Sequence, residues 1–168
     1  MWRPAVLVGR SLADVLTAGV CAAFVAITGL IVGWRPDAGA ASIVGGFAIF
    51  LLFSYGISWG CACLGMLSKS PESAQGIGLV ILFPLAIVSN ALVPTEHMPA
   101  LLQTLANWNP VSAVTAASRQ LLGNPNPSAS IQVWPMQHPV LASLLWSVVL
   151  IAVFAPLASS LYRRRTTD

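Results

Sequence analysis

The chain has 168 residues, of which 57% are hydrophobic and only 8% are charged. Soluble domains carry about 25% charged residues, so this composition excludes an ordinary soluble domain and predicts a surface covered by the lipid bilayer. The formal net charge of +3 comes from eight basic residues scattered along the chain, a distribution that argues against nucleic acid as a partner.

Four apolar segments are long enough, or nearly so, to cross a bilayer, because a spanning helix needs about 20 apolar residues. We expect spans at about 15–33, 41–67, 77–93 and 140–162, the third of them interrupted by Pro84. The first is too long for a signal peptide and lacks a clear cleavage site, so we expect it to be retained. The sequence thus predicts an all-α polytopic membrane protein that forms a single transmembrane domain over residues 1–168.

Two pairs of glycines with i, i+4 spacing lie within the first two spans. They are Gly29 with Gly33, and Gly56 with Gly60. This spacing lets helix backbones approach closely in lipid, although glycine is also generally common in membrane helices. We predict tight helix packing at these four positions, against a helix of the same chain or of another subunit.

The segment 94–139 between the last two spans holds seven of the twelve prolines and predicts two short helices. An apolar face with helical spacing is formed by Met98, Leu101, Leu102, Leu105 and Trp108. Asn109 then resembles an N-cap followed by Pro110 at the first helical position, and the second helix should run to about Leu122 and stop at Gly123. We expect both helices to lie at the membrane interface or to be re-entrant.

The distribution of basic residues predicts the orientation of the chain. One side of the membrane would hold Arg3, Arg10, Lys69 and Arg163 to Arg165, and the other would hold Arg35 and Arg119. Cytoplasmic loops carry the excess of lysine and arginine, so both termini should face the cytoplasm and segment 94–139 should be the outer loop.

Arg119 has two possible roles. Near the end of a short helix it stabilises the helix dipole, which is the role we favour, or it pins that helix to the outer rim of a pathway.

The sequence offers little for catalysis or ion coupling. Asp14 lies at the cytoplasmic start of the first span, and the other three spans contain no charged residue. No phosphate-binding loop and no nucleophile–base pair are present, and Cys61 and Cys63 point about 200° apart on a helix. We therefore expect no catalytic, cofactor-binding or metal site in this chain.

Several short motifs occur in a characteristic order. GRSLAD stands at 9–14 before the first span, and the inner loop follows at 68–75. The most specific series is SNALVP at 89–94, Met98-Pro99, Asn109-Pro110-Val111 and Arg119-Gln120-Leu121. In this order the motifs resemble permease subunits of type-2 ABC exporters, especially the daunorubicin-resistance-like branch of actinobacteria, over nearly the whole chain.

The resemblance implies a permease in the plasma membrane that exports an amphipathic drug or lipid, as in antibiotic resistance. Its partners would be an ATP-binding cassette subunit, which carries ATP and magnesium, and a second permease subunit in a homodimer or heterodimer. The resemblance assigns coupling to the ATPase to Arg10, Asp14, Lys69 and Glu72. It assigns the outer gate or loop to Pro94, Met98, Pro99, Asn109, Pro110 and Arg119.

Permeases of this family have six spans, and the four expected here would correspond to the third through sixth. We therefore expect that the chain is a truncated form. Two alternatives stay open, a non-transporting membrane scaffold or assembly protein and a decayed permease fragment. A membrane-embedded enzyme would need a polar cluster inside the bilayer, which the sequence lacks.

Overall fold

The computed structural model describes residues 4–93, 98–127 and 131–165, and this part of the chain is helical without strands. Its helices are α1 Pro4–Val32, α2 Ala40–Leu67, α3 Pro71–Ile87, α4 Ala100–Trp108, α5 Pro110–Leu121, α6 Trp134–Gln137 and α7 Pro139–Arg165. The predicted all-α class is confirmed, and so are the two short helices between the last two long ones.

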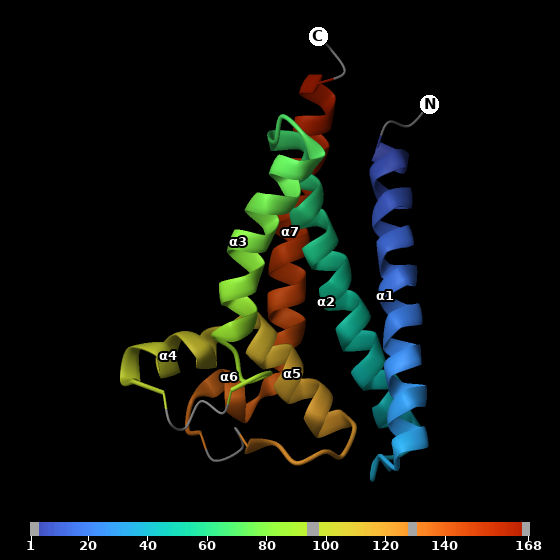
Figure 1. Cartoon of the computed structure of the whole chain (residues 1–168), viewed down its shortest axis with the longest axis vertical. Helices are drawn as coiled ribbons and strands as arrows, with labels where there is room; N and C mark the ends of the chain where they lie inside the picture. The colour runs from blue at the N-terminus through green and yellow to red at the C-terminus, as the bar shows by residue number, and fades with distance from the viewer. Residues whose placement is uncertain (1–3, 94–97, 128–130, 166–168) are drawn as a thin grey trace.

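The long helices run alternately up and down (Figure 1). The N-terminal end of α1, the α2–α3 connection and the C-terminal end of α7 lie at one end of the molecule. The short helices α4, α5 and α6 gather at the opposite end, beside the α1–α2 connection. We call these the terminal end and the loop end of the molecule.

Among the described residues, three helices are long and apolar enough to cross a membrane, over Val8–Val32, Ala40–Leu67 and Pro139–Arg163. The first, second and fourth predicted spans each coincide with one of these candidate helices, although α1 begins at Pro4, well before residue 15. Helix α3 has only 17 residues and a length of about 26 Å, which is shorter than the roughly 30 Å of the hydrocarbon core.

The predicted limits of the third span, 77–93, are wrong. The helix starts earlier because Ser70 caps its N-terminus through its side chain and Pro71 occupies the first helical position. It ends earlier, at Ile87, because Asn109 of the next segment donates hydrogen bonds to the carbonyl oxygens of Leu85 and Val88 at 2.7 and 2.6 Å.

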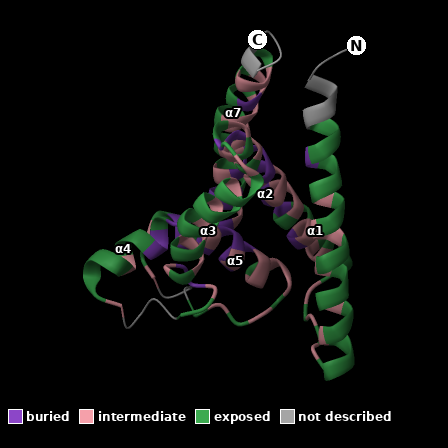
Figure 2. Ribbon diagram, turned by 45° about the horizontal axis from the view of Figure 1, so that its top comes forward, coloured by how far each residue is buried: buried purple, intermediate pink, exposed green. Residues whose placement is uncertain are grey.

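The core is formed mainly by α2 and α7, which make the most extensive helix–helix contact. Near the loop end, Ile49 and Phe53 of α2 pack against Val114 and Ala117 of α5. Near the terminal end, a second cluster is formed by Trp59, Cys63 and Ala158. Figure 2 shows that the buried residues lie along α2, α5 and α7.

Helices α1 and α3 stand largely outside this core (Figure 2). Val25 and Ile31 of α1 are 72% and 80% exposed, and no residue of α3 is buried. In water such apolar faces would be costly, whereas in a bilayer they face lipid or another membrane helix.

Candidate functional site

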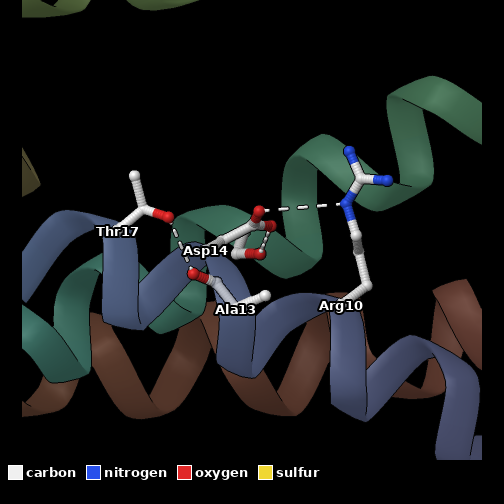
Figure 3. A network of polar contacts seen from close by, with 5 residues as sticks. Arg10, Ala13, Asp14 and Thr17 are labelled. Carbon is white, nitrogen blue, oxygen red and sulfur yellow. Dashed lines mark hydrogen bonds and ion pairs between the residues drawn. The ribbon is translucent and has the colours of Figure 1, made fainter.

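A carboxylate joins α1 to α2 within the membrane-spanning region. Ser58 of α2 donates a hydrogen bond from Oγ to Asp14 Oδ2 at 2.6 Å, and Arg10 Nε lies 3.9 Å from Asp14 Oδ1 (Figure 3). The arginine is one turn before the aspartate on the same helix, so the pair follows the i, i+4 spacing. The three side chains form a polar contact between two otherwise apolar helices.

Asp14 lies deeper than the sequence predicted. The apolar part of α1 extends over Val8–Val32, so Asp14 falls inside the candidate span rather than at its start. An ionisable residue at such a position is costly unless it is paired, and here Arg10 and the hydroxyl of buried Ser58 pair it. Sequence reasoning missed Ser58, because one serine in an apolar helix has no evident partner.

We expect Asp14→Ala and Ser58→Ala to be coupled in a double-mutant cycle by about 1 kcal/mol, the size of a typical polar contact between membrane helices. The measurement is reversible unfolding of the purified protein in mixed micelles. The control cycle is Arg10→Ala with Asp14→Ala. Arg10 Nε lies 3.9 Å from Asp14 Oδ1, beyond hydrogen-bond distance, so this pair should be coupled less strongly than Ser58 and Asp14. A Ser58–Asp14 coupling of zero would show that the hydrogen bond does not hold α1 on α2.

The other two predicted coupling residues lie at the terminal end, Lys69 on the short α2–α3 connection and Glu72 in the first turn of α3. Lys69 and Glu72 are both exposed. The pKa of Glu72 lies below its usual value because its own backbone N–H and the Ser70 hydroxyl donate hydrogen bonds to the carboxylate. In the described part of the chain, no hydrogen bond or ion pair joins these residues to Arg10 or Asp14.

The distance along α2 explains this separation. Ser58, the partner of Asp14, is ten residues from Ser68 at the end of the helix, or about 15 Å at the usual rise. The structure therefore divides the predicted coupling set into two parts, Arg10 and Asp14 on α1 and the exposed pair Lys69 and Glu72 where α2 passes into α3.

A second polar cluster lies at the loop end, where α5 holds the turn that follows α3. The backbone N–H of Asn90 donates to Ser112 Oγ at 3.0 Å, and Arg119 Nη1 donates to the Asn90 carbonyl oxygen at 3.1 Å. Asn90 Nδ2 also approaches Met136 Sδ of α6 at 3.7 Å. Arg119 lies in the last turn of α5, so it favours the helix dipole and holds the α3–α4 segment as well.

Asn109 organises the ends of two helices. Its Oδ1 accepts a hydrogen bond from the Val111 N–H at 2.9 Å, which confirms it as the N-cap of α5 with Pro110 at the first helical position. Its Nδ2 donates to the carbonyl oxygens of Leu85, in the last turn of α3, and of Val88, the residue that follows the helix. Since Asn109 is 95% buried, no water replaces these bonds when they are lost.

The remaining predicted gate residues either lie outside the described part of the chain or are less buried than Asn109. Pro94 lies outside the described residues. Met98 is half-buried, and Pro99 is exposed and precedes α4. The apolar face predicted for α4 is present but not covered, since Leu101 is 83% exposed and Trp108 is 52% exposed.

The four predicted packing glycines have different surroundings. A Cβ atom on Gly56 would lie 3.0 Å from Leu150 Cβ of α7, and one on Gly60 would lie 3.8 Å from the Phe154 ring. Gly29 lies against the side chain of Trp34, which follows the end of its own helix.

Gly33 ends α1. It has a φ of +110°, and the Trp34 N–H donates to the Gly29 carbonyl oxygen at 2.8 Å, as in a Schellman motif. Nothing in the described part of the chain packs on Gly33, so its contact with another subunit stays a prediction.

Comparisons with known proteins identify relatives of this chain. The family described as ABC-2 type transporter matches residues 1–122. The daunorubicin resistance ABC transporter permease protein DrrB1 of Streptomyces coeruleorubidus is 36% identical over 164 residues, which cover 98% of this chain and 55% of that protein. The chain thus spans about half the length of this curated relative, and no solved structure matches it. With most of its length matched and three helices long enough to span a bilayer, the chain is a multi-pass membrane protein that belongs to the ABC-2 type transporter family.

Proposed function

We propose that this chain is the membrane-spanning subunit of an ATP-driven exporter, with ATP and magnesium bound by a separate ATP-binding cassette subunit. The observation that carries the proposal is the 36% identity to a resistance permease over 98% of the chain. Hydrolysis then belongs to the partner, and this chain supplies helices that change their packing when the partner binds ATP.

The terminal end is the side on which the ATPase docks. Lys69 on the α2–α3 connection and Glu72 in the first turn of α3 are exposed there with opposite charges. Six of the eight basic residues belong to this side by sequence, which supports a cytoplasmic location of both termini. A cysteine at position 69 that reacts with an impermeant reagent in intact cells would contradict this orientation.

The cargo is an amphipathic drug or lipid, and a second permease subunit completes the pathway. The exposed apolar faces of α1 and α3 suit contact with another permease subunit, and α2 and α3 carry no charged side chain except Glu72 in the first turn of α3. A pathway wall of this kind accepts apolar molecules without binding them through fixed charges.

The test is affinity purification of the C-terminally tagged chain from its native membrane, with mass spectrometry of the proteins recovered. We expect an ATP-binding cassette subunit in the eluate. Lys69→Glu should lower its recovery by about three- to tenfold, the equivalent of roughly 0.7–1.4 kcal/mol. Asp37→Lys is the matched control, because it also reverses one exposed charge but lies at the loop end.

The other outcomes separate the alternatives. A stable chain that recovers no ATPase would contradict the exporter proposal and favour a scaffold or assembly protein. A chain that is rapidly degraded in its native cells would favour a decayed permease fragment. Equal loss of the ATPase with Lys69→Glu and Asp37→Lys would place the docking surface elsewhere.

A further inference from the structure

A groove of about 530 Å³ runs between α1 and α2 in the half of the helix pair nearer to the loop end. Its walls include Ala22, Val25 and Ala26 of α1 and Phe47 and Phe50 of α2, and Leu122 after α5 closes one side. The volume falls in the range of about 300–1,000 Å³ that is usual for small-molecule sites. The walls carry no charged side chain.

The groove is bounded at the membrane surface by a fixed tryptophan. Trp34 lines it and folds back onto Gly29, where an added Cβ would lie 3.3 Å from the ring. The indole Nε1 donates to Asn124 Oδ1 at 2.8 Å, which ties the α1–α2 connection to the segment after α5. Tryptophan favours the interface between hydrocarbon and headgroups, so the groove begins at headgroup level and extends into one leaflet.

A positively charged residue is next to this tryptophan in the chain. Arg35 follows Trp34 directly, is exposed, and donates one hydrogen bond from Nη1 to the Leu30 carbonyl oxygen at 3.3 Å. A guanidinium has five N–H donors, and the described part of the chain engages no other donor of this one. The acidic neighbour Asp37 is exposed as well, and the structure shows no ion pair between it and Arg35.

We propose that this groove is a binding site for one phospholipid, with an acyl chain between α1 and α2 and the phosphate at the Arg35 guanidinium. In the bilayer an apolar groove that opens sideways meets hydrocarbon, and an empty one would forfeit dispersion contacts along both helices. Arginine recognises phosphate oxygens through paired N–H donors, and Arg35 directly follows Trp34, which lines the groove at its headgroup end. The site requires only the membrane location of the chain and does not depend on export activity.

The test uses phosphatidylglycerol that carries a photoreactive diazirine in its acyl chain, with the full chain reconstituted in phosphatidylcholine vesicles. We expect cross-links on the α2 peptide that contains Phe47 and Phe50, in excess of those on the exposed face of α7. Ala22→Trp fills the groove and should lower this labelling about tenfold or more, since excluding even two CH₂ groups weakens binding about tenfold. Ala23→Trp is the matched control, because it adds the same ring about 100° away around α1 and should leave the labelling unchanged.

Two further variants keep the test decisive. Ala22→Leu adds less bulk than tryptophan and serves if the larger side chain impairs folding, with an expected partial loss of labelling. The phosphate of phosphatidylglycerol carries a net negative charge, whereas the choline group neutralises that of phosphatidylcholine, so Arg35 should favour a phosphatidylglycerol probe. Arg35→Gln should remove this preference while chain labelling in the groove persists. Equal labelling of α2 and α7, no change with Ala22→Trp, or cross-links from groove residues to a second protein chain would each overturn the proposal. None of these readouts involves the ATPase, so failure here is distinct from failure of the exporter proposal.

Discussion

Replacing Gly56 with leucine should prevent the chain from reaching its folded state, and replacing it with alanine should lower the free energy of unfolding by about 1–3 kcal/mol. A single added Cβ atom at this position would lie 3.0 Å from Leu150 Cβ and 3.4 Å from the Ser147 backbone oxygen. These atoms belong to the middle of α7, the helix that makes the most extensive contact with α2.

The cost is high because the obstruction is helix backbone and a Cβ atom rather than the mobile end of a side chain. Relief requires α2 and α7 to separate, and this would also loosen the two core clusters on either side. Close approach at small residues is the main source of helix association in lipid, where the hydrophobic effect between helices is absent.

The measurement is reversible unfolding in mixed micelles for the alanine variant, and size-exclusion chromatography of the detergent extract for the leucine variant. Gly60→Ala is the matched control, since its Cβ would make an ordinary contact of 3.8 Å with the Phe154 ring. If Gly56→Ala and Gly60→Ala unfold with the same free energy, close packing at Gly56 does not stabilise the protein.

The sequence predicted features that depend on local chemistry. The second span was placed almost to the residue, because an uninterrupted apolar run ends at both sides in polar or small residues. The start of α5 was predicted because both of its signals are local: Asn109 caps the N-terminus of the helix, and Pro110 is the first residue of the helix. Gly123 was likewise predicted as a stop, and its φ of +71° is the conformation that glycine adopts most easily.

Features that depend on distant partners could not be predicted. Apolar residues continue past Ile87, and the side chain that ends α3 there is 21 to 24 residues away in the sequence. The two glycine pairs have identical spacing, yet Gly56 faces α7 whereas Gly33 ends its own helix. The i, i+4 spacing of glycines predicts a helix surface without bulky side chains. The tertiary fold determines which segment packs on that surface.

The exposed faces of α1 and α3 show a further limit of one isolated chain. Their composition fits lipid and a second subunit equally well, because both are apolar. The candidate site therefore consists of the features that the chain fixes by itself, namely the Asp14–Ser58 contact inside the span and the α3–α5 cluster at the loop end.

We expect Asn109→Ala to lower the free energy of unfolding by about 3 kcal/mol more than Asn107→Ala. The two asparagines are two residues apart and almost equally buried, at 5% and 4% exposure. Asn109 makes three hydrogen bonds to backbone groups of α3 and α5, whereas Asn107 Oδ1 has no hydrogen-bond partner in the described part of the chain. Both changes delete the same atoms, so the cavity contributions largely cancel and the difference reports the hydrogen bonds.

The loss at Asn109 also leaves the carbonyls of Leu85 and Val88 unpaired in a buried place, and each such group costs about 1–3 kcal/mol. The variant Asn109→Asp tests separately how much the hydrogen bonds to the Leu85 and Val88 carbonyls contribute. It keeps the acceptor for the Val111 N–H but turns a carboxylate oxygen toward the two carbonyl oxygens, so it should destabilise the protein at neutral pH at least as much as alanine does. Unfolding of all three variants in mixed micelles gives the comparison. If Asn109→Ala and Asn107→Ala have the same free energy of unfolding, packing alone fixes the end of α3. The junction between α3 and α5 then does not depend on the Asn109 side chain.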